Sequence, residues 1–161
     1  MTDPLPPIRH SLDVSAPPAE AFRIFTAAMD SWWPLATHSI DSERVTGCVF
    51  EGATGGRIFE THDDGTMHLW GTVAISEPPA SIVFSWHPGR PEHTAQEIEL
   101  RFTPRGQGTL LEFEQRGWEA LGDRAAPARQ GYETGWPHVL ARYVERCLDE
   151  AVTAVEDPPA D

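Results

Sequence analysis

The chain has 161 residues, which fits one domain, and 40% of them are hydrophobic, which is enough to bury a core. It carries 25 acidic and 12 basic residues, and all of the basic ones are arginine, so its formal net charge is −13. A surface this acidic repels phosphate groups, which excludes nucleic acids and anionic membranes as expected partners.

Features of the termini and of the cysteines indicate the compartment. No stretch reaches the ~20 apolar residues of a membrane span. Residues 1–10 have neither the basic nor the apolar region of a signal peptide. Cys48 and Cys147 lie far apart and belong to no CxxC motif, which is typical of buried free thiols in a reducing compartment. We therefore expect a cytoplasmic protein.

The first third of the chain predicts one strand followed by helix. Residues 1–7 are rich in proline and are expected to form a flexible tail. Residues 8–14 alternate apolar and polar side chains, which predicts a half-buried strand. Pro17-Pro18 suits the first turn of a helix, and an apolar stripe follows it. We expect this helical region to end near Met29–Trp33, before Pro34.

Residues 46–118 predict a meander of six strands, because turn residues interrupt the segment repeatedly. The expected turns are Gly55-Gly56, Asp63–Gly65, Pro78-Pro79, His87–Gly89 and Pro104–Gly108. Between these turns, residues 82–86, 96–102 and 109–115 alternate apolar and polar side chains. Such alternation is typical of an antiparallel sheet with one buried face and one wet face.

The last part of the chain predicts a long helix. Residues 119–134 are expected to be loop or short helix. Proline is favoured at the first position of a helix and poorly tolerated inside one, so we expect the helix to begin at about Pro137. Its apolar stripe follows i, i+3, i+4 spacing and consists of Leu140, Tyr143, Val144, Cys147, Leu148 and Ala151. Residues 157–161 are expected to form a second flexible tail.

The element order predicts an α+β fold in one domain, residues 8–156. A curved antiparallel sheet of six to seven strands would surround the long C-terminal helix, with two short helices after the first strand. One helix is about 10 Å across, whereas six or seven strands at ~4.8 Å each are about three times as wide. The helix therefore cannot cover the inner face alone. We expect the short helices around Phe22–Trp33 to roof the remaining space and leave a cavity.

Several segments resemble one known family. The run from Gly55 to Trp86 (GGRIFETHDDGTMHLWGTVAISEPPASIVFSW) is similar to the signature of proteins homologous to the activator of the heat-shock chaperone ATPase. Residues 108–118 (GTLLEFEQRGW), residues 131–143 (GYETGWPHVLARY) and the early helix running into Trp32-Trp33-Pro34 also resemble that family. It is a branch of the START-like (SRPBCC) superfamily. The resemblance spans about residues 8–150 and implies a helix-grip fold with a deep apolar cavity between sheet and C-terminal helix.

Aromatic residues are the main candidates for a ligand site. Six tryptophans are many for this length, and they either fill the core or line a cavity, since ligand pockets favour aromatic walls. The wall we expect consists of Trp33, Phe84, Trp86, Phe102, Phe113, Tyr132, Trp136 and Leu140. Weaker candidates are Trp32, His38 and Trp70.

Glu60 is the weak catalytic candidate, because it lies in an otherwise apolar strand segment. A two-residue turn at Asp64-Gly65 would place it opposite Leu69 on the apolar face, and a longer turn would change that partner. Burial there would raise its pKa and suit acid–base chemistry. The alternative is a solvated strand glutamate. His62 and His68 flank the same hairpin, but zinc needs further ligands, so no metal and no cofactor are expected.

Three function classes stay open. The favoured one is a non-enzymatic binding domain for a small apolar or aromatic molecule. The second is an enzyme of cyclase, lyase or hydrolase type that uses Glu60 or a cavity histidine. The third, suggested by the resemblance, is a chaperone-linked protein-interaction domain, but 161 residues leave no room for the extra domain of the eukaryotic activator, so a chaperone partner is not favoured. A homodimer is compatible with the sequence.

Overall fold

The computed structural model describes residues 5–156. The strands are β1 (Ile8–Val14), β2 (Val45–Phe50), β3 (Arg57–His62), β4 (Met67–Glu77), β5 (Ser81–Trp86), β6 (Gln96–Arg105) and β7 (Gly108–Arg116). The helices are α1 (Pro18–Phe25) and α2 (Ala125–Glu156), with 3-10 turns η1 (Met29–Ser31), η2 (Glu92–Thr94) and η3 (Trp118–Arg124). Of the expected flexible tails, residues 1–4 and 157–161 lie outside the described residues.

The last residues of the expected N-terminal tail contact α2. Arg129 donates hydrogen bonds to the carbonyl oxygens of Pro6, at 2.7 Å, and Pro7, at 3.3 Å.

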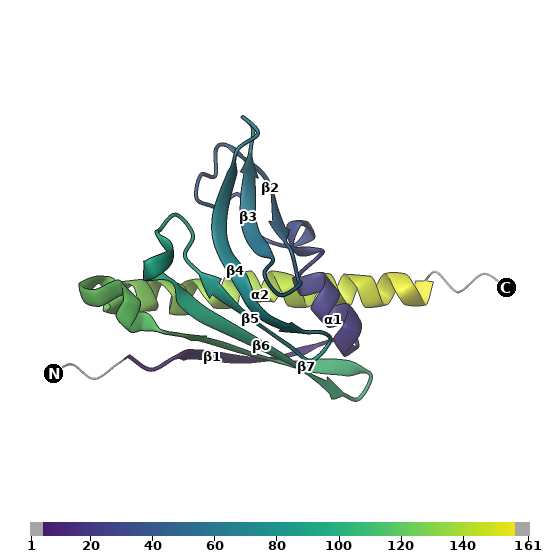
Figure 1. The fold of residues 1–161 in the computed structure, drawn as a ribbon. Coiled ribbons are helices and arrows are strands. Elements are labelled where there is room, and N and C mark those ends of the chain that lie inside the picture. The colour runs from purple at the N-terminus through teal and green to yellow at the C-terminus, as the bar shows by residue number, and fades with distance from the viewer. Residues whose placement is uncertain (1–4, 157–161) are drawn as a thin grey trace.

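The strands form one antiparallel sheet in the order β1-β7-β6-β5-β4-β3-β2. Consecutive strands from β2 to β7 are neighbours, as the meander predicted, and β1 joins the far edge beside β7. The sheet curls around α2, which runs along it as one long helix (Figure 1). The predicted α+β, helix-grip architecture is therefore confirmed.

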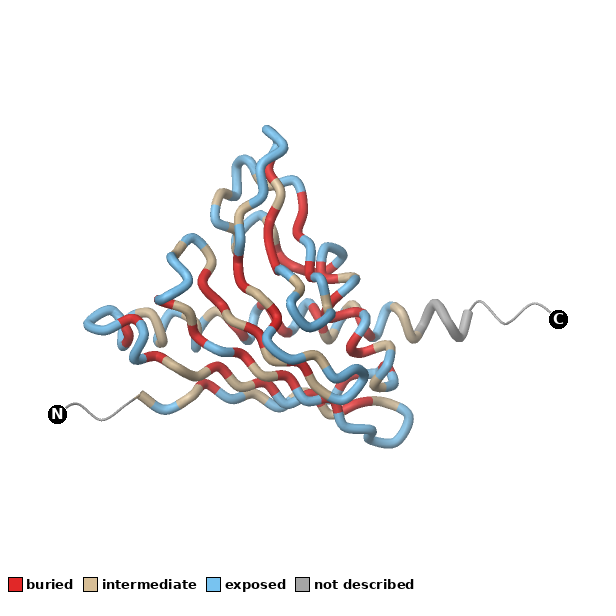
Figure 2. The backbone as a smooth tube through the Cα atoms, viewed as in Figure 1, coloured by how far each residue is buried: buried red, intermediate tan, exposed pale blue. Residues whose placement is uncertain are grey.

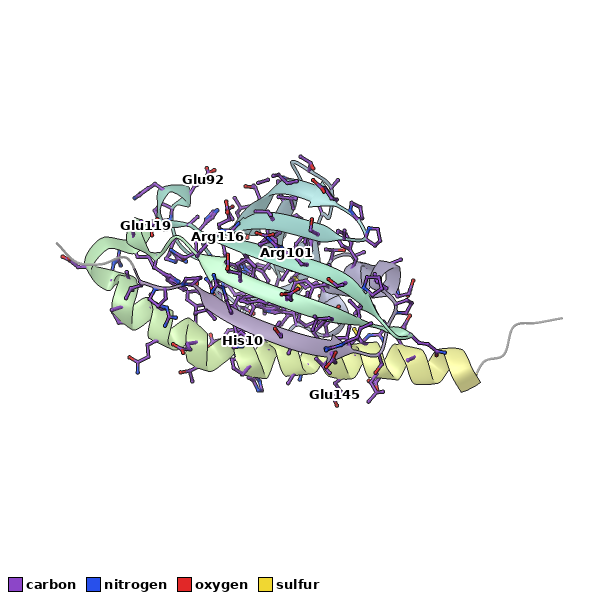
Figure 3. All side chains as sticks on the ribbon, turned by 90° about the horizontal axis from the view of Figure 1, so that it is seen from below. His10, Glu92, Arg101, Arg116, Glu119 and Glu145 are labelled. Atoms are coloured by element: carbon purple, nitrogen blue, oxygen red, sulfur yellow. The ribbon has the colours of Figure 1, made fainter. Side chains whose placement is uncertain are left out.

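The two faces of the sheet differ as the alternation predicted. On β6, the inward side chains of Ile98, Leu100 and Phe102 are at most 3% exposed. Buried and exposed positions alternate along the strands (Figure 2). The outer face carries ion pairs: Arg116 on β7 contacts Glu99 on β6 at 2.9 Å. Figure 3 shows Arg116 and Arg101 on these strands.

The first helical region is shorter than expected. Helix α1 ends at Phe25, and only the 3-10 turn η1 follows before Pro34. Phe22 and Phe25 from α1 are nonetheless buried and pack against the sheet and α2, with ring centroids 5.3 Å from Phe102 and 5.0 Å from Tyr143. Helix α1 therefore fills this end of the inner face, where it was expected to roof a space.

The predicted start of the last helix at Pro137 was wrong. Helix α2 begins at Ala125 and continues through Pro137. The residues on both sides of the proline belong to one buried stripe, with Trp136, Val139 and Leu140 each at most 5% exposed. Packing of this stripe outweighs the ~3 kcal/mol that an interior proline costs a helix.

Candidate ligand-binding pocket

A pocket of about 630 Å³ lies between the first half of α2, the end of β5 and the loop before β2. Its volume is within the range of small-molecule sites, and it is open to solvent. The lining residues are Trp33, His38, Ser39, Ile40, Trp86, Pro88, Gly89, Pro127, Ala128, Gly131, Tyr132, Gly135, Trp136 and Val139.

The deep wall of the pocket belongs to a tryptophan cluster, which consists of Trp33, Trp70, Trp86 and Trp136. Trp33 is at its centre, with ring centroids 5.0 Å from Trp70, 5.7 Å from Trp86 and 6.0 Å from Trp136. Trp86 and Trp136 are 5.6 Å apart. The rings meet at tilted or edge-on angles, which aromatic pairs prefer. Three of the four rings line the pocket, and Trp70 supports them from behind.

Small residues of α2 form a second part of the pocket lining. Ala128, Gly131 and Gly135 follow the i, i+3, i+7 spacing of one helix face. A Cβ atom added at Gly131 would have no heavy atom within 4 Å, and one at Gly135 would lie 3.8 Å from His38 Nε2. Gly131 therefore leaves open space beside α2, and Gly135 lets the ring of His38 come close to the helix. These small residues were not among the predicted site residues, although the glycine spacing inside a helix was the available signal.

Polar groups in the pocket are few. His38 stacks on His138, with ring centroids 5.6 Å apart. Burial, together with the neighbouring His138, lowers the pKa of His38 below the ordinary histidine value, so the imidazole is neutral at neutral pH. The lining also includes Ser39 and the phenol of Tyr132, and among its described residues there is no carboxylate, arginine or cysteine.

The indole N–H groups of the lining tryptophans differ in their partners. Trp33 donates to the carbonyl of His38 at 2.9 Å, and Trp136 donates to the side-chain oxygen of Gln115 at 2.7 Å. The indole N–H of Trp86 has no acceptor among the residues that the structure describes. It is a candidate donor to a ligand.

The pocket brings together only part of the predicted site. Of the expected residues, it is lined by Trp33, His38, Trp86, Tyr132 and Trp136. The others lie in the filled core behind or beyond it: Trp32, Trp70, Phe84, Phe102, Phe113 and Leu140, each at most 3% exposed. Some of these form the support of the pocket. Phe113, for example, packs against Trp136 with ring centroids 4.8 Å apart.

Glu60 is buried on the inner side of β3 but does not line the pocket. Residues 63–66 connect β3 to β4, and the register of the two strands places Glu60 opposite His68 instead of Leu69. Leu69 is 39% exposed on the other face. The Glu60 carboxylate accepts hydrogen bonds from the backbone N–H groups of Ile40, at 2.6 Å, and Asp41, at 3.2 Å.

The acid–base role expected of Glu60 is not supported by its environment. Its carboxylate also accepts the indole N–H of Trp70 at 2.8 Å and lies 2.6 Å from Nε2 of His62. Burial disfavours the charged form, but the hydrogen bonds from Ile40, His62 and Trp70 outweigh it and lower the pKa of Glu60. The expected raised pKa was wrong, and the group is an ionised acceptor held by four donors.

The two hairpin histidines do meet. The rings of His62 and His68 stack with centroids 3.9 Å apart. Nε2 of His68 contacts the hydroxyl of Thr66 at 2.8 Å, and Nε2 of His62 contacts Glu60, so both nitrogens have protein partners. Among the described residues no three metal-ligating side chains gather. Within residues 5–156, none of the helices is long and apolar enough to span a membrane.

Known proteins share this architecture and part of the sequence. The solved structure of an anthrahydroquino-γ-pyrone synthase complexed with SUM is 29% identical, with a TM-score of 0.62, over 90% of this chain and 99% of that one. CalC, a self-sacrificing resistance protein from Micromonospora echinospora, is 26% identical, with a TM-score of 0.68, over 90% and 96% of the two chains.

A third structure, the Aha1 dimer from Colwellia psychrerythraea, is 17% identical, with a TM-score of 0.62, over 88% of this chain and 95% of that one. At this identity the similarity shows the fold alone. None of the curated proteins matches the chain. The sequence pattern of the family described as Activator of Hsp90 ATPase homolog 1-like protein matches residues 15–146. The chain therefore belongs to the family of Activator of Hsp90 ATPase homolog 1-like proteins.

Proposed function

We propose that the chain is a binding domain for a small aromatic molecule, which it holds without covalent chemistry in the pocket beside α2. The observation that carries the proposal is the pairing of two unlike walls. One wall is the tryptophan cluster, and the other is a helix face of Ala128, Gly131 and Gly135. A flat ring system would stack on the first and lie close to the backbone of the second.

The glycines strengthen this proposal because they are unfavourable for the helix. A glycine inside a helix costs about 1 kcal/mol relative to alanine. Two of them face the same pocket in α2, where Gly131 has open space at its Cβ. A fold that needed only a stable helix would gain from a larger side chain there. An occupant that requires the space accounts for their presence.

The polarity of the pocket favours binding over catalysis. General acid–base chemistry commonly uses a pair of positioned ionisable groups. Among the described lining residues, His38 is the single histidine and there is no carboxylate, so a second group of that kind is missing. An enzyme that uses the neutral His38 as a base is the second candidate. It is supported by the 29% identical relative that is named as a synthase. The location of the protein in the cytoplasm and its assembly as a homodimer remain predictions.

A ligand panel tests the proposal. Naphthalene and fluorene represent flat aromatic ligands, and dodecanoate represents a linear apolar one. We expect the aromatic compounds to change the emission of the tryptophan cluster and to raise the melting temperature, since a ligand that binds only the folded state stabilises it. No change in emission and no thermal shift across the panel would overturn the proposed function.

A further inference from the structure

Arg90 has an unusual set of partners for an arginine in so acidic a chain. Its guanidinium donates to the carbonyl of Thr94 at 2.7 Å and to the side-chain oxygen of Gln96 at 2.9 Å. It also donates to the phenol oxygen of Tyr132 at 3.1 Å. All of these acceptors are neutral. Among the residues that the structure describes, no carboxylate lies within ion-pair distance of Arg90.

The contact with Arg90 fixes the hydrogen-bond role of the Tyr132 hydroxyl. A guanidinium has donors and no acceptor, so the phenol oxygen must accept in this pair. The phenol proton then points away from Arg90. Within the described part of the chain the Tyr132 hydroxyl has no other hydrogen-bond partner. Tyr132 lines the pocket, and its ring is held by Trp118 at 5.7 Å and Trp136 at 6.3 Å between centroids.

We propose that Tyr132 is a specificity-determining donor and Arg90 its positioning residue, so that the pocket selects aromatic molecules that carry an acceptor oxygen such as a ring carbonyl. This inference rests on the proposed function. The tryptophan cluster supplies affinity for the flat ring, and the phenol proton recognises the oxygen. The positive charge of Arg90 polarises the phenol and makes its O–H a better donor.

The simpler reading is that Arg90 only holds the loop between β5 and β6. It does contact the carbonyls of Trp86 and Thr94, which lie on the two sides of that loop. Holding the loop would affect every ligand alike, because it shapes the pocket as a whole. Recognition of an oxygen affects one ligand and not its hydrocarbon analogue. The two readings therefore differ in selectivity and not in affinity alone.

Fluorene and 9-fluorenone provide the matched pair. Both are planar tricycles, and the methylene group of fluorene is a carbonyl group in 9-fluorenone. The dissociation constants of both are measured by equilibrium dialysis against wild type, Tyr132→Phe, Arg90→Gln and Tyr143→Phe. Selectivity is the ratio of the fluorene constant to the fluorenone constant. The free energy of removing the fluorenone carbonyl from water is the same for every variant, so it cancels when the ratios of two variants are compared.

We expect the selectivity for fluorenone to fall about three- to tenfold in Tyr132→Phe, the range of one hydrogen bond. Arg90→Gln should lower it in the same direction. Tyr143→Phe is the control, because it removes the other phenol of the chain, which donates to the Ala21 carbonyl in the core. If fluorene binds and the selectivity of Tyr132→Phe equals that of wild type, the inference is overturned and the proposed function stands. If neither compound binds wild type, both fall.

Discussion

Glu60 on β3 accepts the backbone N–H of Ile40 at 2.6 Å, and this hydrogen bond fastens one wall of the pocket to the sheet. Ile40 lines the pocket together with Ser39 and His38, which precede it in the same loop. The carboxylate takes a second backbone N–H from Asp41. A buried charge in an apolar strand is therefore explained by the loop donors that it satisfies, without a catalytic role.

Replacing Glu60 by glutamine tests this anchoring role. An amide has one acceptor oxygen and adds two donors, so the four donors around position 60 cannot all be satisfied. We expect Glu60→Gln to lower the unfolding free energy by about 2 kcal/mol or more, as buried donors left without partners do. Glu112→Gln, at an exposed position of β7, is the control and should change stability little. Urea unfolding of the three proteins measures the difference, and equal losses at both positions would contradict the account.

The pH dependence of stability gives a second test of Glu60. Its pKa is lowered from 4.5 because its hydrogen bonds outweigh its burial, so near that pH the unfolded chain binds a proton that the folded chain does not. The stabilisation is therefore complete above the unfolded pKa and is lost as the pH falls through the folded one. We expect the difference in unfolding free energy between wild type and Glu60→Gln to shrink below pH 4.5. A difference that grows on acidification would show that folding raises the pKa of Glu60 instead of lowering it.

The sequence was a good guide wherever local pattern decides the structure. The alternation of residues 96–102 predicted the inner side chains of β6, and the turn residues predicted where β4 and β5 meet. The sequence was a poor guide where packing between distant segments decides the structure. Pro137 marks a helix start by local rules, yet the stripe that contains Trp136 and Leu140 keeps the helix continuous.

The stripe on α2 yields a paired prediction. Leu140 is 1% exposed, whereas Leu148, two turns later on the same helix, is 50% exposed, so its predicted place in the apolar stripe was wrong. Leu140→Asp should cost about 3–5 kcal/mol of stability, because it buries a charge without a partner. Leu148→Asp should cost less than about 1 kcal/mol, as surface substitutions do. Thermal unfolding of both variants measures this, and similar losses would contradict the burial assigned to Leu140.

Pro137 is itself testable, since it is exposed in the interior of α2. It has no N–H to donate to the carbonyl of Glu133, one turn earlier. Pro137→Ala restores that donor and should raise the unfolding free energy by about 1–3 kcal/mol. A loss of stability in calorimetry would mean that the proline stabilises the local helix geometry.

The site was predicted less well than the fold, for a physical reason. Aromatic residues that fill a core and those that line a pocket have the same composition and the same strand spacing. Phe102 and Trp86 both point inward, but Phe22 from α1 covers the first and open space lies beside the second. The distinction depends on Gly131 and Gly135, which come before the expected start of the long helix at Pro137.

A larger side chain on α2 would fill the pocket and tests whether the ligand binds there. Gly131→Leu places a side chain in space where no heavy atom lies within 4 Å of the new Cβ, and it should raise helix stability by up to about 1 kcal/mol. Ala141→Leu, at an exposed position of α2 outside the pocket lining, is the matched control.

The measurement is the fluorene dissociation constant of wild type and both variants, by equilibrium dialysis. We expect Gly131→Leu to bind fluorene at least about tenfold more weakly than wild type, the effect of losing ~1.4 kcal/mol of contact. Its melting temperature should be unchanged or higher. Ala141→Leu should bind as wild type does. Equal affinity of Gly131→Leu and wild type would contradict the account, because the ligand would then lie somewhere other than this pocket.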